Sequence, residues 1–202
     1  MKWSTAVGHV SRLAEQCAEM ADLLAHMRVL QVDEMWVYGE LLGVQRDLEW
    51  ASAALCVDLP IDEVPWLCRP AGADRWAEMT RASKNPVGIV WRSIHAPVWN
   101  HRVLRPVLVW DRAGGVRDSA ITAIRQGQGA AVGMAAPSKE EFVARIDDEL
   151  RGSLDELQRR TREYETEHTT RLGVRADALY AAAVGYLDVL EANKSDVSAD
   201  LP

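Results

Sequence analysis

Apolar residues recur every three or four positions from Ser4 to about Val29, with charged side chains between them. Such spacing gathers the apolar side chains on one face of a helix. The pattern therefore predicts a long N-terminal helix with a single buried stripe. The stripe consists of Ala6, Val7, Val10, Leu13, Ala14, Cys17, Met20, Ala21, Leu24 and Met27.

Four later segments have the composition of β-strands. The first, residues 34–42, is rich in aromatic and β-branched residues and contains Gly39, which suits a strand that ends in a turn. A second strand is expected at residues 47–58, and the short connection between the two favours an antiparallel hairpin. Segments 87–91 and 103–110 would complete a sheet of about four strands.

The remaining pattern is helical. Short helices are expected at about residues 61–66, 72–83 and 116–125. The glycine-rich segment 126–133 indicates a flexible connection. After it, Ser138 and Glu141 fit a capping box that starts a long helix through Phe142, Ile146, Leu150, Leu154 and Leu157. A final helix is expected at about residues 176–192.

Together these elements predict an α+β protein. It would have a small, mostly antiparallel sheet, an N-terminal helix packed on that sheet, and a C-terminal helical pair. The expected divisions are an α+β domain at residues 1–126, a helical region at 137–193 and a frayed tail at 194–202. All eight tryptophans occur at or before Trp110, which indicates that indoles pack the sheet region.

Composition narrows the function classes. The 202 residues carry a net charge of -7, which argues against a broad nucleic-acid footprint or an anionic membrane surface. The three cysteines form no CxxC pair, so neither a disulfide framework nor a zinc site is indicated. No signal peptide or long apolar run is recognisable. We therefore expect a cytoplasmic protein without a membrane partner.

Acidic residues follow the first predicted strand at a spacing that suggests chemistry. Asp47 and Glu49 open the second strand, just after the turn at Gly39. Residues i and i+2 of a strand project to the same face, so the two carboxylates would lie together. Such a pair can hold Mg²⁺ and leave its other positions to water and phosphate. A hairpin whose exposed start carries two acids by chance is the alternative.

This arrangement resembles the nucleotidyltransferase fold of the DNA polymerase β type over roughly residues 4–111. The resemblance implies that Gly39 is the first glycine of the turn that binds substrate. It also implies that Asp47, Glu49 and Asp111 are the catalytic and metal-binding carboxylates of a Mg²⁺-dependent nucleotidyl transfer. Glu40 stands where that family has Ser or Gly, and the gap to Asp47 is short, so a degenerate, non-catalytic member is a second form of this hypothesis.

Other segments resemble a different group of proteins. Residues 37–42, 64–66 and 97–102 are similar to an uncharacterised family of actinobacterial proteins, a domain of unknown function. That resemblance implies no activity.

The run Trp99, Asn100, His101 and Arg102 is a candidate substrate-binding segment. An indole could stack on a base, and the guanidinium could bind phosphate. The alternative is an edge strand with Trp99 in the core and with Asn100 and Arg102 at the surface.

Arg162 and His168 form a second candidate pair, on the last-but-one helix. Their spacing resembles the Arg-x4-6-His motif of the helical HEPN ribonucleases. The alternative is a solvated helix face with ion pairs between residues three and four apart.

Two functional hypotheses follow. The first is a nucleotidyltransferase-like protein that binds a nucleotide, or another small-molecule substrate, together with Mg²⁺. The alternative is a non-enzymatic binding or assembly protein that forms a homodimer through its C-terminal helices.

Overall fold

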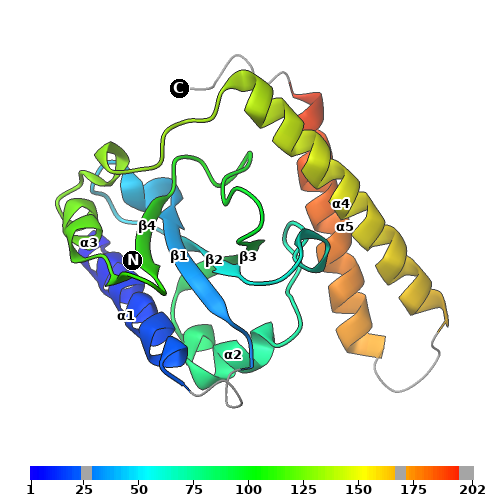
Figure 1. Cartoon of the computed structure of the whole chain (residues 1–202), viewed down its shortest axis with the longest axis horizontal. Coiled ribbons are helices and arrows are strands. Elements are labelled where there is room, and N and C mark those ends of the chain that lie inside the picture. The colour runs from blue at the N-terminus through cyan, green and yellow to red at the C-terminus, as the bar shows by residue number, and fades with distance from the viewer. Residues whose placement is uncertain (24–28, 167–171, 196–202) are drawn as a thin grey trace.

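The computed structural model describes residues 1–23, 29–166 and 172–195 (Figure 1). The described strands are β1 Val32–Tyr38, β2 Ala51–Val57, β3 Val87–Ser93, β4 Val107–Asp111 and β5 Gly115–Val116. The described α-helices are α1 Trp3–Ala21, α2 Ala73–Met79, α3 Asp118–Arg125, α4 Lys139–Thr166 and α5 Leu172–Lys194. Short 3-10 turns occur at Gly39–Leu42, Ile61–Glu63, Ala82–Lys84 and Gly129–Ala131.

The strands form one sheet in the order β3-β2-β1-β4-β5. β1 lies at its centre and pairs antiparallel with both β2 and β4. The predicted hairpin of β1 and β2 is therefore confirmed. β3 pairs parallel with β2, because the chain between them makes a crossover that includes α2. The predicted α+β class and the mostly antiparallel sheet are both confirmed.

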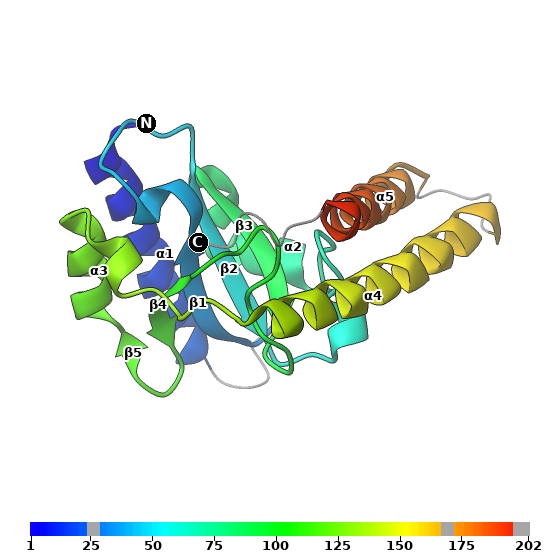
Figure 2. The same ribbon diagram turned by 90° about the horizontal axis from the view of Figure 1, so that it is seen from above.

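α1 and α3 cover one face of the sheet, and α4 and α5 lie on the other side (Figure 2). The buried stripe of α1 runs from Ala6 to Met20, as its spacing predicts, and packs with Trp76, Trp91 and Trp110 in the larger core. α1 ends at Ala21, short of the expected Val29, and residues 24–28 lie outside the described part of the chain.

A second core joins the sheet to the C-terminal helices. Ala54 and Cys56 of β2 meet Phe142 and Ile146 of α4 and Val189 of α5 there. Neighbouring residues of β2 point into the larger core, because successive side chains of a strand alternate between faces. β2 is thus covered on both sides. None of the described helices is long and apolar enough to cross a bilayer.

Two predicted strands start too early. Residues 47–50 form a loop, held by a hydrogen bond from the Leu48 amide to the Met1 carbonyl (2.9 Å). β4 begins only at Val107, because Pro106 lacks an amide donor and Arg105 has a positive φ of 44°. Residues 94–106 are consequently a long loop on the face covered by α4 and α5.

The capping box at the start of α4 is confirmed. The Glu141 amide donates to Ser138 Oγ (3.2 Å), and the Ser138 amide donates to Glu141 Oε2 (2.8 Å). The predicted buried stripe of this helix is correct for Phe142 and Ile146, but beyond them polar residues take the inner positions. Glu149, Ser153 and Glu156 are buried, whereas Leu154 is exposed. Arginine side chains pair with Glu149 and Glu156 and compensate the burial of these two carboxylates.

Gly185 marks the closest approach of α5 to the loop that precedes α2. A Cβ atom at Gly185 would lie 2.3 Å from the Trp66 carbonyl oxygen, which is far inside van der Waals contact. Gly152 on α4 has no atom within 4 Å of such a Cβ. The first glycine is required by packing, and the second is not.

We expect Gly185→Ala to lower the free energy of unfolding by about 1–3 kcal/mol, because the added methyl group forces α5 away from Trp66. Gly152→Ala is the matched control and should raise it by up to about 1 kcal/mol through helix propensity alone. Urea denaturation of both variants measures the difference. Equal stability of the two variants would contradict this packing.

Candidate functional site

The structure places the two predicted metal-binding carboxylates of the hairpin on the surface. Asp47 and Glu49 are exposed in the loop before β2, and Leu48 between them is buried. They do not belong to a strand, so the expected i, i+2 alignment on a pleated surface is wrong. Gly39 does make the expected turn, with φ of 77°, but Glu40 beside it forms an exposed ion pair with Arg46 (3.2 Å).

The Asp111 carboxylate is hydrogen-bonded to neighbouring residues at the end of β4. It accepts hydrogen bonds from the amides of Ala113 (3.1 Å) and Gly114 (2.7 Å) and from Arg117 Nε (2.8 Å). Burial opposes ionisation, but these donors outweigh it and lower the pKa of Asp111. The carboxylate closes the turn between β4 and β5.

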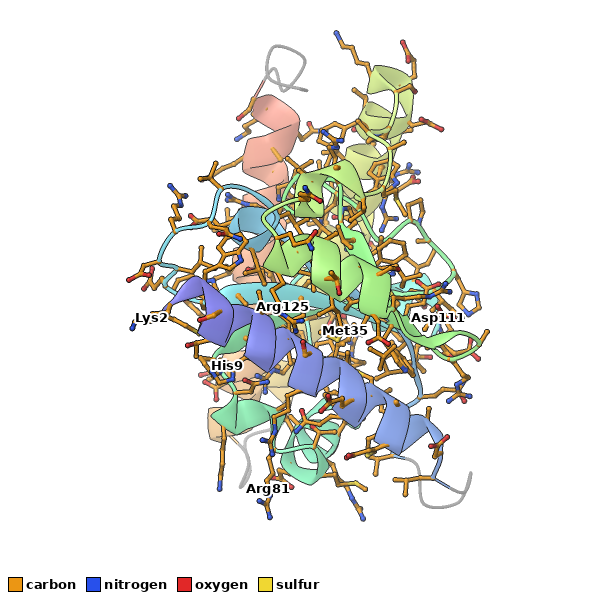
Figure 3. All side chains as sticks on the ribbon, turned by 90° about the vertical axis from the view of Figure 1, so that its left-hand side faces the viewer. Lys2, His9, Met35, Arg81, Asp111 and Arg125 are labelled. Atoms are coloured by element: carbon orange, nitrogen blue, oxygen red, sulfur yellow. The ribbon has the colours of Figure 1, made fainter. Side chains whose placement is uncertain are left out.

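The three carboxylates lie at opposite ends of the sheet. Asp111 pairs with Glu34 near the start of β1, whereas Ser52, just after the loop of Asp47 and Glu49, pairs with Tyr38 at its end. Four residues of strand span about 13 Å. In Figure 3, Lys2, which follows Met1 and its contact with Leu48, and Asp111 lie on opposite sides of the molecule.

Ligands of one Mg²⁺ ion must all approach it to about 2 Å. The geometry therefore does not let Asp47, Glu49 and Asp111 share a metal ion. Within the described ranges, no group of three or more His, Cys, Asp or Glu side chains is placed to hold a metal.

The segment from Trp99 to Arg102 contacts the C-terminal helices. It lies in the loop between β3 and β4, so the edge-strand interpretation is wrong, and Asn100 is completely buried. Trp99 stacks on Phe142 of α4, with 6.4 Å between ring centroids. The four side chains are thus directed to α4 and α5, and their use in binding a substrate stays a prediction.

Glu149 of α4 is the centre of a buried polar cluster. Arg92 of β3 forms an ion pair with its Oε1, and Arg145 forms another at 2.9 Å. Asn100 Nδ2 donates to its Oε2 (2.8 Å). Arg92 also donates from Nε to the Val98 carbonyl (3.0 Å). The cluster therefore ties together the sheet, the long loop and α4.

Neighbouring positive charges keep the Glu149 carboxylate ionised. Burial by itself favours the neutral form of Glu149, but the Arg92 and Arg145 guanidinium groups and the Asn100 amide outweigh it and lower its pKa. Arg92 also lies over the ring of Trp66, 5.5 Å from the centroid. The Arg92 charge is thus compensated by the Glu149 carboxylate and by the ring of Trp66.

Asp188 of α5 is the centre of a second polar cluster. Trp66 Nε1 donates to its Oδ2 (2.8 Å), His101 Nε2 donates to the same oxygen (2.7 Å), and Arg102 Nε donates to Oδ1 (3.0 Å). Burial opposes ionisation, but the three donors outweigh it and lower the pKa of Asp188 to about 2. This carboxylate fixes α5 to the loops on both sides of β3.

A third set of ion pairs lies along α4, between residues 156 and 163. Arg159 and Arg160 both contact the buried Glu156, at 2.6 Å and 2.7 Å, and both also contact Glu163. These pairs between residues three and four apart are those expected as the alternative to a nuclease motif, but the face is not wholly solvated, because Glu156 is buried. Arg162 lies on the same helix, and His168 lies outside the described residues.

Sequence reasoning missed Arg92, Glu149 and Asp188. A signal for Glu149 exists: Phe142, Ile146, Glu149, Ser153 and Glu156 follow one another at alternating spacings of four and three, so polar residues continue an apolar stripe. For Arg92, the signal is a lone charge in an apolar strand. Neither signal identifies the partner.

Comparisons with known proteins identify a family, but its description names no activity. A family profile described as "Domain of unknown function (DUF7711)" matches residues 1–195. No curated protein matches the chain, and no solved structure does.

We expect Glu149→Gln to lower the free energy of unfolding by about 3–5 kcal/mol, because it leaves Arg92 and Arg145 buried without a counter-charge. Asp148→Asn removes an exposed ion pair with Arg151 on the same helix and should cost less than about 0.5 kcal/mol. Chemical denaturation at neutral pH compares the two. A small loss for Glu149→Gln would show that the cluster does not hold α4 on the sheet.

The second cluster predicts a pH dependence. The folded pKa of Asp188 lies below its ordinary value of 3.8, so its ionised form stabilises the fold above that pH and the contribution is lost as the pH falls toward 2. We expect Asp188→Asn to be less stable than the wild type at neutral pH, with the difference shrinking between about pH 4 and pH 2. Thermal melts across this range test it, and a pH-independent difference would contradict it.

Proposed function

Because the chain belongs to this family of domains of unknown function (DUF7711), we propose a function from its own geometry: a non-enzymatic assembly protein that forms a homodimer through α5. The observation that carries this proposal is the exposed apolar face of α5. Tyr180 is 72% exposed and Leu187 is 54% exposed, although they lie near the middle of the helix.

α5 is apolar on two opposite faces. Ala182, Gly185 and Val189 are buried on the side toward the rest of the protein. The opposite face continues a second apolar series, in which every member is exposed or half-buried: Ala176, Tyr180, Ala183, Leu187 and Leu190. Their alternating spacings of four and three are those by which two helices pack along a seam.

Charges at the two ends of α5 favour an antiparallel second copy. With a two-fold axis between Gly185 and Tyr186, one register brings three complementary pairs together. Asp177 lies opposite Lys194, the Tyr180 hydroxyl opposite Glu191, and Val184 opposite Leu187. Asp177 and Lys194 are exposed and have no ion-pair partner among the described residues. An antiparallel pair also opposes the two helix dipoles favourably.

A parallel pair would fit less well. It would set Glu191 against Glu191 and Lys194 against Lys194, and like charges repel. A two-fold antiparallel pair uses the same surface on both copies, which closes the assembly as a dimer.

The fixed position of α5 supports this role. Asp188 and Gly185 hold its inner face against the Trp66 and His101 loops, so the outer face needs no rearrangement before it meets a partner. The nucleotidyltransferase hypothesis has no comparable support, since its three carboxylates lie at opposite ends of the sheet.

We expect the wild-type protein to have twice the 22.5 kDa mass of one chain in solution, and Leu187→Arg to weaken dimerisation at least tenfold. The control is Val44→Arg, at an exposed apolar residue (82%) of the loop before β2, which should leave the mass unchanged. Light scattering after gel filtration, over a range of concentrations, measures both. A monomeric wild type would overturn the proposal.

Charge exchange tests the register. Asp177→Lys and Lys194→Asp should each weaken the dimer, because each single change sets like charges opposite one another. The double variant should recover most of the affinity. A double variant as weak as the two single changes combined would exclude this antiparallel pairing.

A further inference from the structure

A groove of about 680 Å³ runs between α2 and β3, on the side of the sheet away from β4. Val87, Ile89 and Trp91 of β3 line one wall, and Ala73 and Ala77 of α2 line the other. The two alanines keep the helix wall shallow. Neither α5 nor the polar clusters described above contribute to this groove.

Strand β3 has one free edge. It pairs with β2 alone, so it is a terminal strand of the sheet. The Ile94 amide donates to the Val57 carbonyl of β2 (3.1 Å), which fixes the direction of every second peptide group. Because the peptide groups of successive residues point to alternate edges of a strand, the amides and carbonyls of Val90 and Arg92 also face β2. Those of Ile89 and Trp91 therefore face away from it.

Among the described residues, these outward peptide groups have no hydrogen-bond partner in the sheet. Within the described part of the chain, no other element donates to or accepts from the backbone of Ile89 or Trp91. Asn85 supplies a further acceptor in the same groove. Its Nδ2 donates to the His9 carbonyl (3.1 Å), and its buried Oδ1 has no hydrogen-bond partner among the described residues. The groove thus offers backbone donors and acceptors in a row, which is what an added strand requires.

The charges at the rim are acidic on balance. Asp74 of α2 is paired with Arg69. Glu78, one turn further along the helix, is exposed and has no ion pair within the described residues. A cationic side chain would complement it.

We propose that this groove binds an extended segment of a partner protein, which adds as a strand to the free edge of β3 and places a basic side chain at Glu78. Binding by strand addition draws its affinity from main-chain hydrogen bonds and its specificity from alternate side chains. Here those side chains would enter between Ile89 and Ala77. This site is independent of the α5 seam.

The test uses the full-length ¹⁵N-labelled protein and three acetylated heptapeptides of alternating valine and threonine. They carry lysine, glutamate or proline at the centre. We expect the lysine peptide, at up to millimolar concentration, to shift the amide signals of Ile89 and Trp91 and to protect both from hydrogen exchange. The glutamate peptide should bind at least tenfold more weakly, and the proline peptide should not bind.

Two variants complete the test. Ile89→Pro removes an outward amide without removing a bond to β2, so it should abolish binding in a folded protein. Glu78→Gln should weaken binding of the lysine peptide severalfold, whereas Glu63→Gln, outside the groove, should not. Unchanged Ile89 and Trp91 signals, equal binding of all three peptides, or dimerisation through this edge in place of peptide binding would each overturn the proposal. The peptide comparison on the wild type stands even if Ile89→Pro does not fold.

Discussion

The buried ionised Glu149 is the interaction on which the C-terminal half of the structure depends. It holds α4 to Arg92 of the sheet and to Asn100 of the long loop, and it does so where water is excluded. A buried ion pair of this kind adds little net stability over an apolar contact, but a missing partner is costly. The pairing therefore favours an orientation of α4 in which Glu149 is buried together with Phe142 and Ile146, while Leu154 is exposed.

α5 is positioned by contacts with the loops on both sides of β3. Gly185 lets its backbone approach Trp66, and Asp188 receives donors from Trp66, His101 and Arg102. Because these contacts use one side of the helix, the residues around Tyr180 and Leu187 are left on the other. The exposed apolar seam is thus a consequence of how the two polar clusters orient the helical pair, and it is the feature from which we infer assembly.

Patterns among residues close in sequence predict the helices and strands, but they do not predict where the site residues lie. The α1 stripe, the β1–β2 hairpin and the Ser138 capping box each depend on residues close in sequence, and the structure has all three. The position of Asp47 and Glu49 depends on where β2 starts, which the contact of Leu48 with Met1 determines. Likewise, no local pattern shows that Arg92 and Glu149, 57 residues apart, share one buried cluster.

Antiparallel pairing of two copies through α5 is the proposal from which the assembly role follows. A spin label on a cysteine introduced at Ser195, which is exposed and takes no part in the proposed charge pairs, tests it directly, because Cys17, Cys56 and Cys68 are buried and should not react. With the axis between Gly185 and Tyr186, the two labels would be separated by about 28 Å along the helix axis. Pulsed electron resonance should find a narrow distance distribution at or somewhat above that value. A much shorter distance would indicate parallel helices, and the absence of any dipolar coupling would contradict the dimer itself.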